Sequence, residues 1–284
     1  MKGLIIGATG LLGKLISEHL ESKGYQIIKT PSEKCNARLG DGKAIEEIIK
    51  DNQPEFIINS AGITDVDICE SSPQKAFLVN AKGCEEISEA INKFTPMTRL
   101  IHISTDHFYD SPSLSKEDEI TLLNYYAYSK FLGERMITCK NHIILRTNFF
   151  GKGKSKKNSF TDWLYYSAKN GTIISLYKNI YFNPLSINTL INLIENMIDS
   201  KEIGTFNVGS RGEMSKFEFG VKFFNNLGFD EYIVKESNYE DSDIRRPKNM
   251  AMDVTKFETS FGLTLPSLED EIYNSIINYT KVIK

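Results

Sequence analysis

A tyrosine and a lysine four residues apart, preceded by hydroxyls at a strand end, are the residues of this 284-residue chain whose spacing suits chemistry. Tyr126 and Lys130 fall in a segment whose pattern predicts a helix, so both side chains share one face, with Cβ atoms roughly 6 Å apart. A phenol beside an ammonium is a proton donor with a lowered pKa, because the cation favours the phenolate. Ser104 and Thr105 follow the apolar run 100–103, which predicts a buried strand. A hydroxyl there can hold a carbonyl against the phenol, so the set indicates reduction of a ketone.

The same tyrosine–lysine spacing occurs elsewhere and is weak on its own. Tyr25 and Lys29 have it on a predicted strand, where four residues span roughly 13 Å and the two groups cannot couple. Tyr165 and Lys169 have it on a predicted helix, but no strand ending in Ser or Thr precedes them. The alternative for the pair at positions 126 and 130 is a solvated helix face. The N-terminal sequence decides against that alternative.

A glycine loop stands at the start of the chain between a predicted strand, 3–6, and a predicted helix, 14–20. Its glycines are Gly7, Gly10 and Gly13. Glycines in this context permit a tight turn and a close approach of backbone to a pyrophosphate, while the helix N-terminus supplies N–H donors and a positive dipole. The loop therefore predicts a dinucleotide site.

The end of the second predicted strand, 25–29, bears on the choice of cofactor. An acid at this point usually meets the ribose of a cofactor that lacks a 2′-phosphate. Here Thr30 replaces the acid, and Lys29, Lys34 and Arg38 lie nearby in the sequence. This positive surrounding favours NADPH, with NADH as the open alternative. The lysines otherwise simply point into water.

Composition excludes several classes of protein. The formal net charge of −3 argues against a nucleic-acid surface as the main function. No apolar run approaches the roughly 20 residues of a membrane span, and Met1-Lys2 leads straight into a strand, so we expect a cytoplasmic protein without a signal peptide. The four cysteines and four histidines are scattered without ligand spacing, so no metal site is expected.

Apolar strands alternate with amphipathic helices along the first half of the chain. This order predicts an α/β, Rossmann-type, doubly wound parallel sheet covered on both faces. We expect a NAD(P)-binding domain over residues 1–150. We expect a smaller, mainly substrate-binding lobe over 151–284, with a part at about 171–208 returning to the first domain.

The second half offers weaker signals. The basic stretch 152–158 either meets a substrate diphosphate or is a solvated loop. Arg245 and Arg246 either bind phosphate or belong to a surface loop. Helices are predicted at 186–199 and, at the end of the chain, at 267–281.

Several stretches together match one group of enzymes. They are Gly7–Gly13, Asn59–Asp67, Ser104–Asp106, Tyr126–Lys130 with Gly133 and Glu134, Leu145–Gly151, Arg246–Asn249 before Asp253, Phe261–Gly262 and Leu265–Pro266. On these motifs the chain resembles the extended short-chain dehydrogenase/reductases, and within them the dTDP-4-dehydrorhamnose reductases, nearly end to end.

The resemblance implies NAD(P)H-dependent reduction of the 4-keto group of a nucleotide-linked deoxysugar, for surface polysaccharide precursors. It implies that Tyr126 protonates the alkoxide formed as hydride arrives. Lys130 would hold the nicotinamide ribose and lower the pKa of Tyr126, and Thr105 would bond the carbonyl oxygen. Asp106 would contact the sugar.

The resemblance also implies binding sets. Leu11 and Leu12, with Gly10, would bind pyrophosphate; Asp41 and Gly42 would bind the adenosine end. The full cofactor set is Gly7, Gly10, Leu11, Leu12, Gly13, Thr30, Asp41, Gly42, Gly62, Ile63, Thr64, Tyr126 and Lys130. The substrate set is Thr105, Asp106, Phe149 and Arg246. Asp41 has a second interpretation from the residues alone, as the N-terminal cap of the helix that follows.

Three departures separate the chain from that family's pattern. His107-Phe108-Tyr109 stands where the family reads Tyr-Val-Phe, Phe149 replaces a substrate-contacting Trp, and Thr30 replaces an acid. Two other functions therefore stay open: a sugar-nucleotide epimerase or dehydratase, and a non-catalytic subunit like the β subunit of methionine adenosyltransferase. The sugar, the base, the oligomeric state (with a homodimer as one outcome) and a Mg²⁺ requirement are also open.

Overall fold

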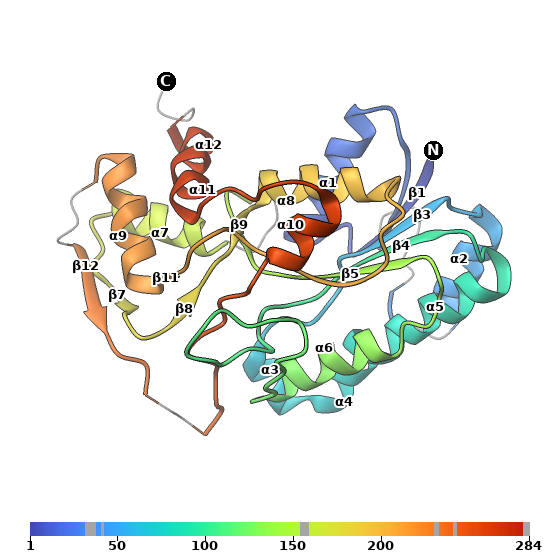
Figure 1. The fold of residues 1–284 in the computed structure, drawn as a ribbon, viewed down its shortest axis with the longest axis horizontal. Helices are drawn as coiled ribbons and strands as arrows, with labels where there is room; N and C mark the ends of the chain where they lie inside the picture. The colour runs from blue at the N-terminus through green and yellow to red at the C-terminus, as the bar shows by residue number, and fades with distance from the viewer. Residues whose placement is uncertain (32–37, 41–42, 154–158, 230–232, 241–242, 281–284) are drawn as a thin grey trace. The chain divides into compact units, whose positions relative to one another are not determined.

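The structure is a computed structural model that describes residues 1–31, 38–40, 43–153, 159–229, 233–240 and 243–280 (Figure 1). The chain forms two compact units. The first comprises Met1–Thr105, Leu122–Arg146 and Ile191–Phe206; the second comprises Asp106–Thr121, Thr147–Leu190 and Asn207–Lys284. The assignment of residues 1–150 to the cofactor and of 151–284 to the substrate stays a prediction.

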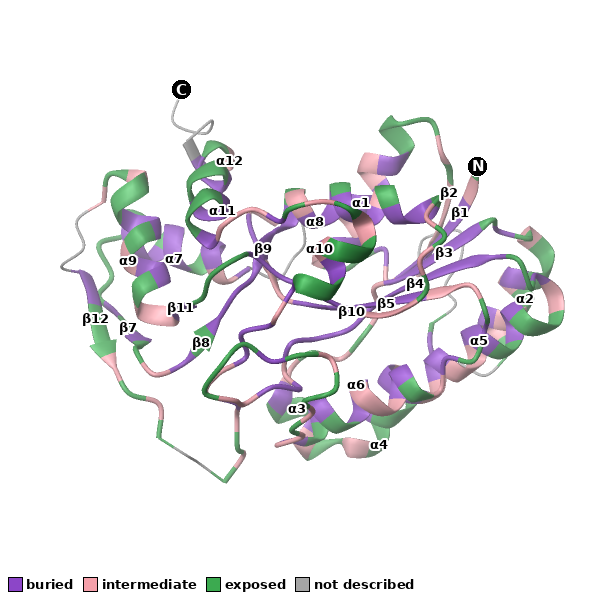
Figure 2. Cartoon of the chain, in the orientation of Figure 1, coloured by how far each residue is buried: buried purple, intermediate pink, exposed green. Residues whose placement is uncertain are grey.

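A six-stranded sheet is the centre of the first unit, with strand order β10-β5-β4-β3-β1-β2. Its strands are β1 (Lys2–Ile6), β2 (Gln26–Thr30), β3 (Phe56–Asn59), β4 (Arg99–Ile103), β5 (His142–Thr147) and β10 (Gly204–Val208). The pairs from β2 through β1, β3 and β4 to β5 are all parallel. Because both faces are covered, β3 and β4 are buried at every position, as Figure 2 shows in purple.

Helices cover the sheet on both faces. Figure 1 shows α1 (Leu11–Ser22) and α8 (Ile187–Ile198) on one face, and α2 (Ala44–Asn52), α5 (Gly83–Phe94) and α6 (Tyr125–Arg135) on the other. Between β3 and α5 lie α3 (Val66–Ser71), α4 (Pro73–Phe77) and a π-helical turn, η1 (Leu78–Lys82). The apolar stripes of α2 and α5 provide Ile45, Ile49, Ile87 and Ile91 to one buried cluster. The expected doubly wound α/β fold is confirmed.

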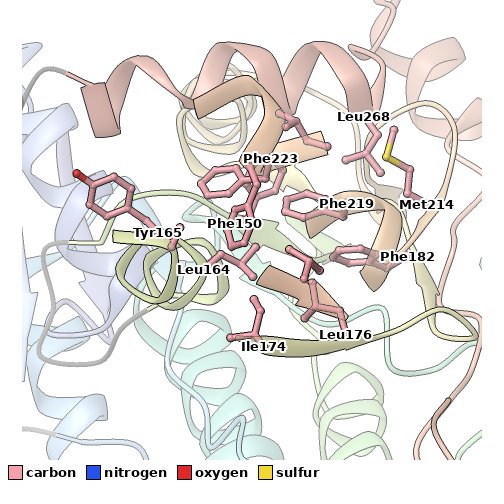
Figure 3. Close-up of a cluster of buried hydrophobic side chains, with 14 of the residues drawn as sticks. Phe150, Leu164, Tyr165, Ile174, Leu176, Phe182, Met214, Phe219, Phe223 and Leu268 are labelled. Carbon is pink, nitrogen blue, oxygen red and sulfur yellow. The ribbon is translucent and has the colours of Figure 1, made fainter. Parts of the chain in front are cut away.

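The second unit combines short strands with helices. Its strands are β6 (Phe149–Phe150), β7 (Ile174–Tyr177), β8 (Tyr181–Phe182), β9 (Leu185–Ser186), β11 (Met214–Ser215) and β12 (Val234–Ser237). Its helices are α7 (Phe160–Lys169), α9 (Lys216–Leu227), α10 (Thr255–Phe261), α11 (Leu268–Ser275) and α12 (Ile277–Thr280). Pairs β6–β9 and β7–β12 are parallel, and β8–β11 is antiparallel. An aromatic core holds the unit together: Phe219 packs against Phe150 and Phe182, at centroid distances of 4.9 and 5.3 Å (Figure 3).

Both helices expected in the second half of the chain differ in their boundaries from the sequence-based expectation. The helix expected at 186–199 begins one residue later, because Ser186 pairs in β9, although its hydroxyl still accepts a bond from the N–H of Thr189. The last helix is interrupted at Ile276, whose N–H bonds the carbonyl of Tyr273 three residues back. A bond of that type tightens the turn and ends the α-helical ladder.

Within the described residues, no helix is long and apolar enough to cross a membrane. The described part of the chain also contains no cluster of three or more metal-ligating side chains. Cys69, Cys84 and Cys139 are buried free thiols.

Candidate active site

The glycine loop joins β1 to α1 in a conformation that requires glycine. Gly7 has φ of +87°, and its N–H donates to the carbonyl of Thr30 at 2.8 Å. A Cβ on Gly13 would lie 2.2 Å from the carbonyl oxygen of Gly7. Gly10 is the N-cap of α1 and makes no side-chain cap bond. The loop thus leaves the first turn of α1 uncapped by side chains, the arrangement that cradles a pyrophosphate.

The other expected cofactor residues near this loop have mixed outcomes. Leu12 is buried under the loop and Leu11 is partly exposed, while the fully buried Thr30 anchors the loop through its carbonyl. Lys29 is engaged elsewhere, because its ammonium pairs with Glu21 at 2.8 Å. The pair is partly exposed, and a role of Lys29 near the 2′-phosphate of NADPH stays a prediction. Asp41, Gly42 and Lys34 lie outside the described residues.

The loop after β3 is held by Asn80, in the π-helical turn η1. The Asn80 amide accepts from the N–H of Ile63 at 2.8 Å and donates to the Ile63 carbonyl at 3.0 Å. It also donates to the hydroxyl of Ser129 on α6, at 3.0 Å. Gly62 and Thr64, on either side of Ile63, are exposed. Asn80 therefore fixes the expected ribose-binding loop to the helix that carries Tyr126. The sequence feature that indicates such hydrogen bonding is an asparagine within the otherwise apolar start of a helix.

Helix α6 places the tyrosine and the lysine as expected. It begins at the N-cap Asn124, whose side chain accepts from the N–H of Ala127 at 2.9 Å. Tyr126 and Lys130 are 6% and 3% exposed, whereas Tyr128 is 52% exposed, so the first two share the buried face. The solvated-face alternative is therefore wrong.

The Lys130 ammonium occupies a defined buried position. It donates to the carbonyl of Ile103, the last residue of β4, at 2.8 Å. A Cβ added to Gly62 would lie 3.8 Å from it, so the expected ribose loop and the lysine meet here. Burial lowers the pKa of Lys130, and electrostatic interactions with Cys84 and Glu134 oppose that shift. Thr105, two residues beyond Ile103, is also buried.

A buried ion pair lies beside the strand end and was not recognised as a pair from the sequence. Glu134 accepts two bonds from the Arg146 Nε, at 3.0 and 3.2 Å, and one from Nη2 at 2.7 Å. The two side chains are 3% and 5% exposed. Ser104 donates to the same carboxylate at 2.5 Å. The strand end that carries Thr105 is thereby tied to α6 and β5.

Apart from Thr105, which ends the first segment of the first unit, the expected substrate-binding residues lie in the second unit. Asp106 is 2% exposed, and one carboxylate oxygen accepts from the Asn148 amide at 2.7 Å. Phe149, on β6, and Arg246 are both partly exposed. Burial lowers the pKa of His107, with Asp106 opposing the shift and Lys216 and Arg246 reinforcing it. Asp106, His107, Arg246 and Lys216 thus share one electrostatic neighbourhood, of which Lys216 was not expected.

The fold, the uncapped glycine loop and the buried tyrosine–lysine face define a nicotinamide-dependent oxidoreductase of the short-chain dehydrogenase/reductase type. The family described as "RmlD substrate binding domain" matches residues 1–281, and the chain belongs to this family.

Individual relatives agree. A probable low-salt glycan biosynthesis reductase, Agl14, of Haloferax volcanii is 26% identical over 96% of both chains. The dTDP-4-dehydrorhamnose reductase of Salmonella typhimurium is 26% identical over 95% of both chains. The structure of the Bacillus anthracis dTDP-4-dehydrorhamnose reductase, solved in complex with NADP, has a TM-score of 0.88 and 25% identity, covering 97% of this chain and 98% of that one.

Proposed function

We propose that the protein reduces the 4-keto group of a nucleotide-linked deoxysugar with NADPH, as dTDP-4-dehydrorhamnose reductases do, in the synthesis of surface polysaccharide precursors. The observation that carries the proposal is the buried face of α6, where Tyr126 and Lys130 lie side by side and the lysine is fixed to the end of β4. Membership of the RmlD family supports the choice of a 4-keto nucleotide sugar.

The residues of this chain fit a nicotinamide dinucleotide. Gly7, Gly10 and Gly13 keep the first turn of α1 open to a pyrophosphate, since a Cβ at the third of them would strike the loop. Leu11, Leu12 and Thr30 would complete this end, and Gly62, Ile63 and Thr64 would meet the ribose. When bound, the cofactor supplies the hydride. The NADP in the Bacillus anthracis relative favours NADPH, with NADH as the weaker alternative.

The chain itself supplies the proton and the geometry. Tyr126 donates its phenolic proton to the carbonyl oxygen as charge develops there, because hydride cannot settle on carbon unless the oxyanion is neutralised. Thr105 donates a hydrogen bond to the same oxygen and orients the carbonyl. Lys130 is held at the end of β4 by its bond to the Ile103 carbonyl and favours the phenolate by its charge.

Residues of the second unit would bind the sugar and the diphosphate of the substrate. Asp106, held by Asn148, would accept a bond from a sugar hydroxyl. Phe149 would give an apolar wall, and Arg246 would pair with the diphosphate. These roles follow from the chemistry of the side chains and from the RmlD resemblance.

Two further properties belong to this proposal. We propose that the reaction takes place in the cytoplasm, where NADPH and nucleotide sugars are made. A homodimer is supported by exposed aromatic side chains on α4 and α6, where Phe77, Tyr125 and Tyr128 line a shallow groove in the first unit. Light scattering on the purified protein measures its mass, and a monomer at all concentrations contradicts the dimer.

The function is tested with a panel of 4-keto deoxysugars linked to dTDP, UDP and GDP, followed by loss of NADPH absorbance. Turnover of one of them is the expected result. Absence of turnover together with co-purification of a second enzyme would favour the binding-subunit function instead. Tightly retained NAD⁺ in the purified protein would favour an epimerase or dehydratase.

A further inference from the structure

Lys216 stands at a place where a cation is unfavourable. It is the first residue of α9, directly after the N-cap Ser215. Ser215 and Glu218 form a reciprocal capping box, with Ser215 accepting from the N–H of Glu218 at 3.1 Å and donating its own N–H to the Glu218 carboxylate at 2.8 Å. This box fixes the start of the helix. Because the positive end of the helix dipole lies there, a lysine in the first turn costs stability unless something compensates it.

The ammonium of Lys216 faces aromatic rings. It lies 3.2 Å from the ring centroid of Phe182 and 5.0 Å from that of Phe160. Figure 3 shows Phe182 among the aromatic side chains of the second unit's core. Across the described residues, its ammonium makes no hydrogen bond and no ion pair, although it carries three N–H donors. Burial lowers the pKa of Lys216 to about 7, and the charge of Asp106 opposes the shift.

The carboxylate of Asp106 also acts on the Lys216 ammonium through its charge. The field of Asp106 acts on both Lys216 and His107, and Asp106 itself is oriented by the Asn148 amide at 2.7 Å. A donor with unfilled N–H positions therefore stands near a fixed acceptor, with aromatic faces beside it. Paired donors and acceptors against an aromatic wall suit neutral hydroxyl and carbonyl groups. A phosphate directly beside Asp106 is disfavoured, because the buried carboxylate repels it, and the substrate diphosphate is assigned to Arg246 instead.

We propose that Lys216 is a specificity-determining residue that donates hydrogen bonds to a hydroxyl or carbonyl oxygen of the sugar, beside Asp106. The inference rests on the proposed function, because it takes the ligand to be the sugar of a nucleotide sugar. A neutral oxygen of the sugar would accept the hydrogen bonds for which the Lys216 ammonium has no acceptor among the described residues. The faces of Phe182 and Phe160 beside the ammonium lower the local polarity, which strengthens such a bond.

Binding calorimetry on the full-length protein tests the inference. The probes are deoxysugars linked to dTDP, UDP and GDP, together with free dTDP, UDP and GDP. In Lys216→Met, the affinity for the nucleotide sugar should fall about 10- to 100-fold, as expected for a hydrogen bond from a charged donor. The affinity for the matching free nucleotide should stay within about threefold. Lys216→Arg should restore part of the loss.

The matched control is Lys222→Met on the same helix, where the ammonium is exposed and pairs with Glu269 at 2.7 Å. This variant should bind every probe as the wild type does. The inference is overturned if Lys216→Met binds the nucleotide sugar like the wild type, or if free nucleotide loses as much affinity as nucleotide sugar. It is also overturned if no probe of the panel binds.

Kinetics separates this inference from the proposed function. With an accepted 4-keto sugar, Lys216→Met should raise the KM for the sugar by a similar 10- to 100-fold factor. Its kcat and its KM for NADPH should change by less than about threefold. A kcat loss with unchanged sugar KM overturns the specificity role and leaves the reductase function standing. Sugar binding without any turnover overturns the reductase function and leaves the calorimetric test of Lys216 decisive.

Discussion

Lys130 on α6 donates a 2.8 Å hydrogen bond to the carbonyl of Ile103, the last residue of β4. This bond joins the helix that carries Tyr126 to the strand that leads into Thr105. The lysine is thus held by the backbone of the strand end that presents the expected carbonyl-binding hydroxyl. The relation shows how helix and strand residues more than twenty positions apart in sequence are joined in the fold.

Replacing the lysine tests both of its roles. Lys130→Met keeps the aliphatic stem and removes the charge, so it should raise the KM for NADPH and lower kcat together. We expect a loss of kcat of about 10²-fold or more, the lower end for general acid catalysis. Stopped-flow and steady-state kinetics with varied NADPH measure the two effects. A change in only one of them contradicts the double role.

The glycine loop makes a prediction about cofactor binding. Gly13→Ala should abolish detectable NADPH binding, because the new Cβ would stand 2.2 Å from the Gly7 carbonyl oxygen. Gly24→Ala is the control, since Gly24 has φ of +89° and no atom within 4 Å of its Cβ position. The control should lose about 1 kcal/mol of stability and keep its NADPH affinity. Fluorescence titration with NADPH measures the affinity of both variants, and urea denaturation measures the stability of the control. Equal NADPH affinity in the two variants would show that the loop is not the pyrophosphate site.

The buried ion pair predicts a large stability effect. Glu134→Gln removes the charge opposite Arg146 and weakens the acceptor of Ser104, so it should lower the free energy of unfolding by about 3–5 kcal/mol. Urea denaturation followed by circular dichroism measures it. Glu236→Gln, in an exposed pair with Lys178, should change stability little. If Glu134→Gln lowers the free energy of unfolding no more than Glu236→Gln does, the buried ion pair does not stabilise the fold.

The inference on Lys216 carries a pH dependence. Its pKa is about 7 in the folded protein against an ordinary 10.5, and an acceptor oxygen favours the ammonium, so ligand binding raises that pKa and takes up a proton. Affinity for the nucleotide sugar should therefore fall as pH rises above about 7, by up to about tenfold per pH unit. Asp106 and Arg246 also face this region, together with His107, whose pKa burial has lowered, and Glu218 lies on the same helix.

Calorimetry from about pH 6.5 to about pH 8.5 follows this change in the wild type and in Lys216→Met. The variant should show a flat profile over that range. The same decline in both proteins assigns the titration to another group.

Local patterns allowed much of the first unit to be predicted. The strand–glycine–helix start and the position of Tyr126 and Lys130 each depend on a few neighbouring residues, and both are confirmed as structural elements. The pairing of Glu134 on α6 with Arg146 on β5 depends on how the helix packs against the strand that follows it, which no local pattern encodes. The pairing of Lys29 with Glu21, a helix residue eight positions earlier, was likewise not predicted from the sequence.

The second unit was harder to predict, because its contacts also join segments that are far apart in the sequence. Nothing around Lys216 in the sequence distinguishes it from an ordinary lysine at a helix start. Its role appears when Phe182, from another segment of the chain, is placed 3.2 Å away and Asp106 within its field. Short strands of two residues, such as β6 and β9, also carry too few positions for an alternating pattern.

The central claim is that Tyr126 donates the proton, and kcat of Tyr126→Phe tests it most directly. The variant keeps the ring and the buried face of α6, so folding and NADPH affinity should be nearly unchanged, while kcat should fall about 10²–10⁴-fold with a 4-keto nucleotide sugar that the wild type accepts. Tyr25→Phe and Tyr165→Phe, which have the same spacing to a lysine, should leave the chemistry unaffected. If Tyr126→Phe keeps more than about a tenth of the wild-type kcat, the active site is elsewhere.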